Sequence, residues 1–240
     1  MSTYISSDFH GYYNEYMQML EKIQFSEDDT LYILGDILDR GPHPIKIMLD
    51  LMNRNNVIII AGNHCVMACE CFKFLLREIT EKSVADIDKD TIEKLLNWHQ
   101  NGSATTLDEF YKLSKEKQRE VVEFIQDFEL YEEIQMNGQD FLLLHAGLGN
   151  FRPEKEIWEY ELDELVWERP DYDVPYYDNK IVITGHIPTL FIDSKANTRP
   201  GYVFKTNNHI AIDCGCGIPG GRLGCIRLED MQEFYVENEK

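Results

Sequence analysis

The chain has 240 residues, of which 43 are acidic and 23 basic, giving a formal net charge of −20 at pH 7. Such a charge repels nucleic-acid backbones and anionic membrane surfaces, so we expect neither as a partner. Hydrophobic residues make up 43% of the chain, and no apolar run approaches the roughly 20 residues of a membrane helix. We therefore expect a globular protein with one domain over residues 1–240.

The start of the chain and its cysteines bear on cellular location. A strand-like segment begins at Thr3 with no secretory leader before it, which predicts a cytoplasmic protein. The spacing of the six cysteines does not match the Cys-x-x-Cys pairs of zinc sites, so reduced thiols are expected rather than a cysteine-based metal site.

The first quarter of the chain alternates between strand-like and helix-like segments. Residues 3–7, 30–34 and 56–61 are apolar runs typical of strands, and residues 12–23 and 44–54 show the three-to-four spacing of amphipathic helices. Apolar strands separated by helices predict parallel pairing through right-handed crossovers, and hence an α/β fold whose sheet is buried on both faces.

A helical pattern follows from about residue 65 to residue 128. Residues 66–80, 90–98 and 115–128 each carry apolar side chains at helical spacing. We expect this stretch to be an insertion that caps one side of a functional site.

Strand-like runs resume after the helical stretch. Asn137 and Gly138 between the first two runs predict the tight turn of a β-hairpin. The runs cover residues 131–136, 140–145, 180–186, 202–207, 209–215 and 223–228.

Five short motifs place metal-binding side chains directly after strand-like runs, where ligand sites of open α/β sheets lie. They are Asp8-x-His10, Gly35-Asp36-x-x-Asp39-Arg40-Gly41, Gly62-Asn63-His64, His145-Ala146-Gly147 and Gly185-His186. Carboxylates, an amide oxygen and several imidazoles suit two neighbouring first-row divalent ions better than one tetrahedral structural zinc. Two such ions about 3.5–4 Å apart are a common device for hydrolysing phosphate esters.

Each motif alone has a simpler explanation. Asp8 and His10 fit a surface carboxylate and a loop histidine. His145 follows a very apolar run and fits a satisfied core histidine. Arg40 fits a surface salt bridge, and such bridges contribute little to stability.

The ordered set of motifs resembles the calcineurin-like metallophosphoesterases, and within them the phosphoprotein phosphatase branch. The segments that carry the resemblance are SDFHG, LGDILDRGPHP, AGNH, LLHAGL, ITGHIPT and the tail IAIDCGCGIPGGRLGCIRL, so it covers nearly the whole chain. Bacterial and phage members of this branch include small Ser/Thr protein phosphatases and diadenosine tetraphosphatases. The resemblance implies a two-sheet β-sandwich flanked by helices, with residues 65–128 as a helical cap.

The resemblance also implies a role for each site residue. A hydroxide bound to two ions would attack phosphorus, and Asp36 would bridge the ions. His64 would protonate the leaving oxygen while Asp39 holds its imidazole. Arg40 and Arg169, the latter in a Trp-x-Arg element, would hold the phosphate. Manganese is our first expectation for the metals, with iron or zinc as alternatives. The six implied metal ligands are Asp8, His10, Asp36, Asn63, His145 and His186.

Two positions depart from the family pattern Arg-Gly-Asn-His-Glu, since this chain has Ala61 and Cys65 at its ends. The missing arginine would remove one cation from the phosphate pocket. A buried thiol at Cys65 is expected to be inert.

Residues 97–110 contain an element that resembles a Trp-x-x-Asn-Gly-(Gly)-x-x-Thr pattern of bacterial members. Trp98, Asn101, Gly102 and Thr105 match it. Two interpretations stay open: a wall on the substrate side of the cleft, or a helix junction at which Asn101-Gly102 ends one helix.

The sequence therefore predicts a dimetal phosphoesterase that hydrolyses phosphate monoesters. A phosphorylated protein is the leading substrate, and a dinucleoside polyphosphate such as diadenosine tetraphosphate is the alternative nucleotide substrate. A third hypothesis is a non-catalytic scaffold, as in the retromer complex subunit. Such scaffolds tend to lose the catalytic histidine or a ligand, whereas His64 and all six ligand positions are present here.

Overall fold

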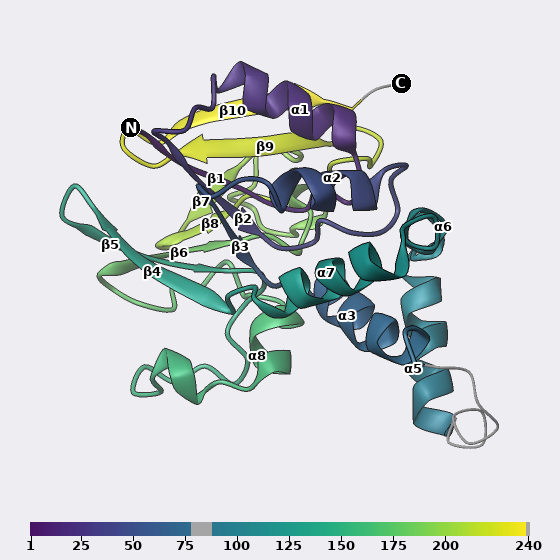
Figure 1. Cartoon of the computed structure of the whole chain (residues 1–240). Helices are drawn as coiled ribbons and strands as arrows, with labels where there is room; N and C mark the ends of the chain where they lie inside the picture. The colour runs from purple at the N-terminus through teal and green to yellow at the C-terminus, as the bar shows by residue number, and fades with distance from the viewer. Residues whose placement is uncertain (78–87, 239–240) are drawn as a thin grey trace.

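The computed structural model describes residues 1–77 and 88–238, which form two stacked five-stranded sheets with helices outside them (Figure 1). The strands are β1 (Thr3–Ser6), β2 (Thr30–Leu34), β3 (Val57–Ile60), β4 (Tyr131–Met136), β5 (Gln139–Leu144), β6 (Lys180–Thr184), β7 (Phe204–Thr206), β8 (His209–Ala211), β9 (Arg222–Arg227) and β10 (Gln232–Glu237). The first sheet has the order β10-β9-β1-β2-β3 and the second β4-β5-β6-β8-β7. The predicted two-sheet sandwich is confirmed.

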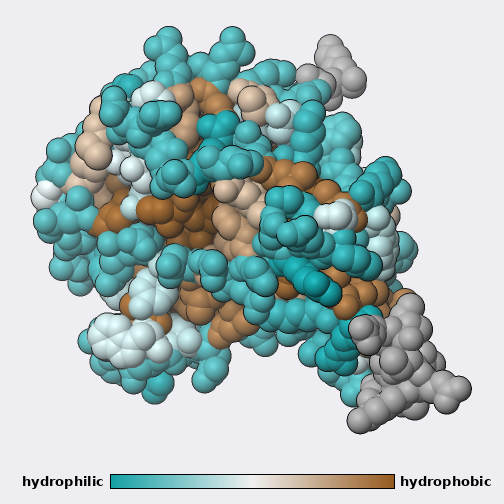
Figure 2. All heavy atoms as spheres, viewed as in Figure 1, coloured by the Kyte–Doolittle hydropathy of each residue, from teal (hydrophilic) through white to brown (hydrophobic). Residues whose placement is uncertain are grey.

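Helices lie over the outer face of the first sheet and beside the sandwich, where several of them form a group on one side (Figure 1). They are α1 (Tyr13–Lys22), α2 (Pro44–Leu51), α3 (Asn63–Leu75), α5 (Lys89–Gln100), α6 (Ala104–Phe110), α7 (Lys115–Gln126) and α8 (Leu162–Val166), with 3-10 turns at Ile157–Glu159 and Thr189–Phe191. Within the part of the chain that the structure describes, no helix is long and apolar enough to cross a membrane. Hydrophilic residues cover most of the face in Figure 2, and hydrophobic residues gather near its centre.

Strand β2 shows why a mostly apolar run forms an inner strand of the first sheet. Leu31 and Ile33 pack into the core beneath the helices, whereas Tyr32 and Leu34 pack into the core between the two sheets. Successive side chains of a strand point to opposite faces, so both faces of β2 must be apolar.

Parallel pairing sets where the strands end. β1, β2 and β3 are parallel neighbours in the first sheet, and β5, β6 and β8 are parallel neighbours in the second. Antiparallel strands flank each set. The carboxyl ends of each parallel set therefore share an edge, and the predicted site residues follow these ends.

The predicted helical insertion over 65–128 corresponds to α3, α5, α6 and α7 among the described residues. Residues 78–80 of the helix predicted over 66–80, like 81–87 of the insertion, lie outside the described residues. Phe72 from α3 stacks on Phe110 from α6 at 3.8 Å between ring centroids and meets Trp98 from α5 edge-on at 5.2 Å. These rings tie three of the helices together.

One strand and two α-helices were missed from the sequence. Strand β10 lies at a sheet edge, and its apolar residues are confined to 234–236 between charged ones, so the apolar run is too short to detect. Helices α6 and α8 have seven and five residues, which is too few for a helical period to be recognised. The hairpin turn is confirmed, with φ of 52° at Asn137 and 81° at Gly138.

We expect Phe72→Ala to lower the free energy of unfolding by about 3–5 kcal/mol, because it removes a fully buried ring and leaves a cavity. Urea unfolding would measure this. Trp158, which is 70% exposed, provides the control, since Trp158→Ala should change the free energy by less than about 0.5 kcal/mol. Equal losses in the two variants would contradict the packing described for the helices.

Candidate metal centre and cleft

The predicted metal-binding residues meet where the parallel strands of the two sheets end. The residues after β1, β2 and β3 come from the first sheet, and those after β5 and β6 from the second. In chain order they are Asp8 and His10, Asp36, Asn63, His145 and His186. All are buried except His186, which is half-buried.

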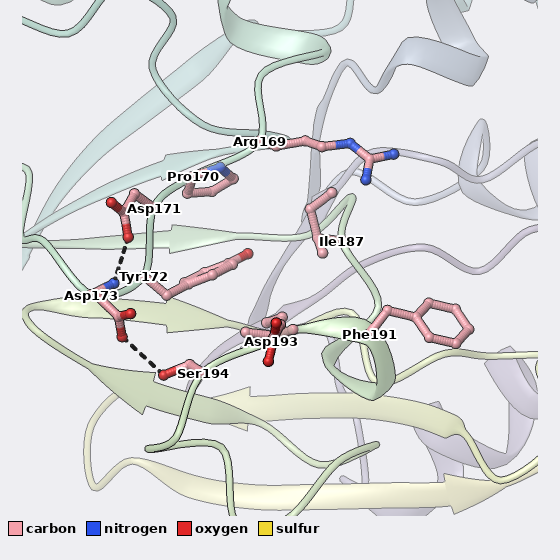
Figure 3. Close-up of a pocket in the computed structure, with 10 residues that line it drawn as sticks. Arg169, Pro170, Asp171, Tyr172, Asp173, Ile187, Phe191, Asp193 and Ser194 are labelled. Carbon is pink, nitrogen blue, oxygen red and sulfur yellow. Dashed lines mark hydrogen bonds between the residues drawn. The ribbon is translucent and has the colours of Figure 1, made fainter.

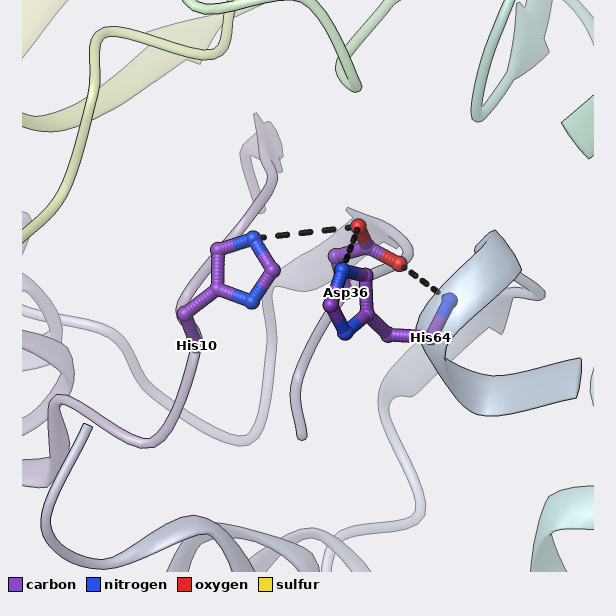
Figure 4. Close-up of side chains that lie close together, drawn as sticks. All are labelled: His10, Asp36 and His64. Carbon is purple, nitrogen blue, oxygen red and sulfur yellow. Dashed lines mark hydrogen bonds and ion pairs between the residues drawn. The ribbon is translucent and has the colours of Figure 1, made fainter. Parts of the chain in front are cut away.

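Asp36 lies at the centre of this cluster. Its Oδ2 is 3.7 Å from His10 Nε2, 3.9 Å from His64 Nε2 and 3.5 Å from His145 Nε2. Figure 4 shows His10 and His64 turned toward the Asp36 carboxylate. Ligand atoms within 4.8 Å of one another form two groups, His10–Asp36–His64 and Asp36–His145–His186. Asp36 belongs to both groups, as a bridging carboxylate must.

Backbone carbonyls determine which ring nitrogen of two histidines faces Asp36. His10 Nδ1 lies 3.0 Å from the Leu38 carbonyl oxygen, and His145 Nδ1 lies 2.7 Å from the Leu34 carbonyl oxygen. A carbonyl oxygen only accepts, so each Nδ1–H donates and each Nε2 keeps its lone pair. The His145 lone pair thus faces the Asp36 carboxylate oxygen with no proton between them, whereas the His10 lone pair accepts from Arg40. A cation resolves this arrangement, and the donor set fits divalent ions.

Burial keeps these imidazoles neutral. It lowers the pKa of His10 and of His145 below the usual value, and lowers the pKa of His186 to about 3. Asn63 Oδ1 lies 3.0 Å from His145 Nε2 and 3.1 Å from His186 Nδ1. Neutral imidazoles and an amide oxygen are competent ligands without first losing a proton.

Asp213 is a buried carboxylate beside Asp8 and Asp36 that was not predicted as a site residue. Burial, together with the charges of Asp213 and Asp36, raises the pKa of Asp8 well above its usual value. Burial, reinforced by Asp36, raises the pKa of Asp213 to about 7. Asp213 follows β8 as Asp36 follows β2, and this shared position after an apolar strand was the signal that could have identified it.

Several site residues adopt the left-handed backbone region, which is uncommon for residues other than glycine. They are Asp8, His10, Asp36, Asp39, Arg40 and His186, with φ of 52°, 42°, 48°, 73°, 67° and 66°. Neighbouring glycines allow the backbone to approach the ligands closely: a Cβ at Gly62 would lie 2.2 Å from Asp36 Oδ1, and one at Gly35 would lie 2.5 Å from His145 Nδ1.

His64 and Asp39 form a buried pair beside the cluster. His64 Nδ1 lies 2.7 Å from Asp39 Oδ2. Trp98 Nε1–H also donates to Asp39 Oδ2, at 2.9 Å, and the Thr106 hydroxyl donates to Asp39 Oδ1 at 2.7 Å. Neither of the last two contacts was predicted from the sequence.

The Trp-x-x-Asn-Gly element is both a helix junction and a part of the cleft lining, the two interpretations left open by the sequence. Asn101 caps the C-terminus of α5 and also lines the cleft. The Gly102 carbonyl accepts from the Arg40 backbone N–H at 3.0 Å. The contact with Asp39 comes from Thr106, whereas the Thr105 hydroxyl is buried without a hydrogen-bond partner among residues 1–77 and 88–238.

A cleft of about 360 Å³ opens next to the cluster. Its lining consists of Asp36, Arg40, Asn63, His64, Asn101, Trp167, Arg169, His186, Ile187, Pro188, Phe191 and Ile218. Arg40 Nη1 donates to His10 Nε2 at 2.9 Å and Nη2 to His64 Nε2 at 2.8 Å. Arg169 lines both this cleft and a neighbouring pocket of about 180 Å³. Figure 3 shows its side chain extending away from Asp171 and Asp173. Both predicted arginines therefore reach the cleft.

The two departures from the family pattern lie together. Ala61 and Cys65 line a separate pocket of about 280 Å³ beside α3 and α7, and neither is among the described residues that line the cleft. Burial raises the pKa of Cys65 to about 12, so its thiol stays protonated and inert.

Comparison with known proteins gives a family and a fold. The sequence matches the calcineurin-like phosphoesterase family over residues 1–211. Among curated relatives, a symmetrical bis(5'-nucleosyl)-tetraphosphatase of Erwinia tasmaniensis is 30% identical over 116 residues, which are 47% of this chain and 42% of that protein. A relative of the same description from Salmonella paratyphi B is 29% identical over 116 residues, 47% of this chain and 41% of that protein. The matched part thus spans less than half the length of these relatives.

Solved structures share the fold over the whole chain. A putative diadenosine tetraphosphatase aligns with a TM-score of 0.62 and 17% identity, covering 99% of this chain and 94% of that one. A protein serine/threonine phosphatase from Saccharomyces cerevisiae, with similarity to human phosphatase PP5, aligns with a TM-score of 0.61 and 14% identity, covering 100% and 81%.

The raised pKa of Asp213 predicts how its removal affects metal-free protein. The folded state holds a proton on Asp213 up to about pH 7, whereas the unfolded chain releases it near pH 4. The stability this proton contributes is complete at low pH and is lost as the pH rises through about 7. Without divalent ions, we expect Asp213→Asn to unfold close to the wild-type temperature at pH 5 and several degrees above it at pH 8, since 1 kcal/mol corresponds to about 2–4 °C in a chain of this size.

Calorimetry with a chelator present would measure both temperatures. A difference between variant and wild type that is the same at pH 5 and pH 8 would contradict a protonated Asp213 in the folded protein.

Proposed function

The chain belongs to the calcineurin-like phosphoesterase family, and we propose that it is a hydrolase that cleaves phosphate monoesters with the help of two divalent ions. The observation that carries this proposal is the Asp36 carboxylate shared by two groups of ligand atoms beside a cleft with two arginines. A carboxylate in this position can bridge two ions, and the cleft places a phosphate next to them.

The ligands divide between two ions. Asp8, His10 and Asp36 would hold the first ion, while Asn63, His145 and His186 would join Asp36 at the second. We propose manganese for both ions, because oxygen and nitrogen ligands of this kind match manganese well. The same ligands also accept iron or zinc, which are the alternatives. Bound ions would act as Lewis acids on the phosphate and lower the pKa of the attacking water.

Arg40 and Arg169 would hold the phosphate oxygens. A guanidinium presents parallel N–H donors that match phosphate, and it stays charged at any working pH. His10 Nε2 has a single lone pair, so it cannot both bind an ion and accept from Arg40 Nη1. We therefore expect the Arg40 guanidinium to turn from His10 toward the phosphate when His10 binds an ion.

His64 would donate a proton to the leaving oxygen. Its Nδ1–H donates to Asp39, so the nitrogen that faces the cleft is Nε2. The Asp39 carboxylate stabilises the imidazolium form, which carries the proton on Nε2 until the ester bond breaks. A positioned acid of this kind contributes about 10²–10⁴ in rate.

We propose a phosphorylated protein as the first substrate, because a cleft of about 360 Å³ is near the small end of ligand pockets and suits one phosphorylated side chain. A dinucleoside tetraphosphate is the second candidate. It is favoured by two aromatic side chains at the cleft, Trp167 and Phe191, which are 39% and 66% exposed and could stack on bases. The activity named for the curated relatives points the same way.

We expect metal-stripped protein to be inactive on phosphate esters and manganese to restore turnover, with calorimetric titration giving two ions per chain. His64→Ala should lower kcat by about 10²–10⁴ because the leaving oxygen loses its acid. His99, exposed on α5, gives a matched control, and His99→Ala should keep full activity. Two bound ions without turnover on any phosphate ester would favour the scaffold hypothesis.

A phosphothreonine peptide and diadenosine tetraphosphate, assayed side by side, would distinguish the substrates. If Phe191 stacks on a base, Phe191→Ala should raise the KM for the dinucleotide about tenfold and leave the KM for the peptide within about twofold. Equal effects on both substrates, or none, would exclude a base-stacking role for Phe191.

A further inference from the structure

We propose that Trp98 and Thr106 are positioning residues that hold Asp39, and through it His64, in the orientation needed for proton donation. The catalytic consequence rests on the proposed function. The positioning itself rests on hydrogen bonds and burial that exist whatever the substrate is.

The Asp39 carboxylate is fixed at both oxygens. Oδ2 accepts from Trp98 Nε1 at 2.9 Å and lies 2.7 Å from His64 Nδ1, while Oδ1 accepts from the Thr106 hydroxyl at 2.7 Å. The Thr106 oxygen in turn accepts from the Asp39 backbone N–H at 2.9 Å. With donors on both oxygens, the carboxylate cannot rotate without breaking a hydrogen bond.

Burial makes each of these contacts consequential. Asp39, Trp98 and Thr106 have no exposed surface, and His64 is 1% exposed. No solvent is in contact with the Asp39 carboxylate to replace a hydrogen-bond donor that a mutation removes. The carboxylate must then rotate to another partner, or the structure must open to admit a water molecule. Either change moves the His64 ring, because the Nδ1–H bond to Asp39 sets its orientation.

The backbone at Asp39 does not hold this position by itself. Its φ of 73° is uncommon for an aspartate and persists only where the surroundings impose it. The next residue, Arg40, is also left-handed and donates its backbone N–H to the Gly102 carbonyl at 3.0 Å. Segment 98–106 therefore binds both the side chain of Asp39 and the backbone that follows it.

The two positioning residues come from a closely packed part of the molecule. Trp98 lies on α5 and Thr106 on α6, and the Phe72 ring packs edge-on to the Trp98 indole at 5.2 Å. Phe72 also stacks on Phe110 of α6. The helices inserted between β3 and β4 thus act as a support for the proton donor, which gives the insertion a role beyond covering the cleft.

The experiment uses variants that remove single hydrogen-bonding groups. Trp98→Phe removes the indole N–H, and Thr106→Val removes the hydroxyl. Thr106→Ser keeps a hydroxyl at this position and loses only the methyl group. Thr105 provides the matched control, because its hydroxyl is buried one residue away without a partner among the described residues. Thr105→Val therefore makes the same chemical change without touching Asp39.

The first readout is the dependence on the leaving group, measured with manganese-loaded protein. Phenyl phosphate needs its leaving oxygen protonated, whereas 2,4-dinitrophenyl phosphate does not. We expect Trp98→Phe and Thr106→Val to lower kcat for phenyl phosphate about tenfold or more, and for the dinitrophenyl ester less than about threefold. Thr106→Ser should recover most of the loss. Equal losses on the two esters would overturn the proposal.

The second readout does not require activity. In zinc-loaded protein, which is diamagnetic, the His64 Nδ1 proton should give a downfield NMR resonance that is absent from His64→Gln. We expect Trp98→Phe and Thr106→Val to shift or broaden it and Thr105→Val to leave it in place. If neither variant moves the resonance more than Thr105→Val does, the positioning is wrong. If both move it while the wild type hydrolyses no phosphate ester, the positioning stands and the proposed function fails.

Discussion

The burial of the Asp36 carboxylate is the constraint on which the rest of the site depends. An ionised group without water needs partners of opposite charge or many donors, or it does not stay ionised. Here the carboxylate lies among imidazoles that burial keeps neutral and beside the carboxylates of Asp8 and Asp213. Arg40 donates to His10 and His64 and so compensates part of this cluster, and divalent ions held by the same side chains would compensate the rest.

The two-sheet architecture follows from the same requirement. Ligands that surround two ions have to arrive from several directions, which a single strand end cannot provide. The parallel strands of the first sheet deliver Asp8, His10 and Asp36, and those of the second deliver His145 and His186. The apolar core between the sheets, with Ile5 and Leu143 among its members, fixes the distance between the two sets.

Much of this was predictable from the sequence because each ligand follows an apolar run. Strand-like runs identified β1, β2, β3, β5 and β6 and thereby the position of every predicted ligand. Asp213 was overlooked as a site residue although it follows an apolar strand as Asp36 does. The contacts of Trp98 and Thr106 with Asp39 span 59 and 67 residues, and no local pattern encodes which of two adjacent threonines faces inward. The positive φ at Arg40 could not be predicted from the sequence either, since arginine has no preference for that conformation.

Because the predicted ligands are far apart in the sequence, ion binding would be linked to the stability of the folded state. His186 donates its backbone N–H to the Asp8 carboxylate across 178 positions, so the two halves of the ligand set exist together only when the first and second sheets are joined. A partly folded chain therefore has no complete set of the predicted ligands, and ions would bind the native state almost exclusively. By mass action, each tenfold rise of a free ion above its dissociation constant adds about 1.4 kcal/mol to the stability of the folded state. The supply of divalent ions in the surroundings would then govern how long the chain resists proteases as well as how fast it turns over substrate.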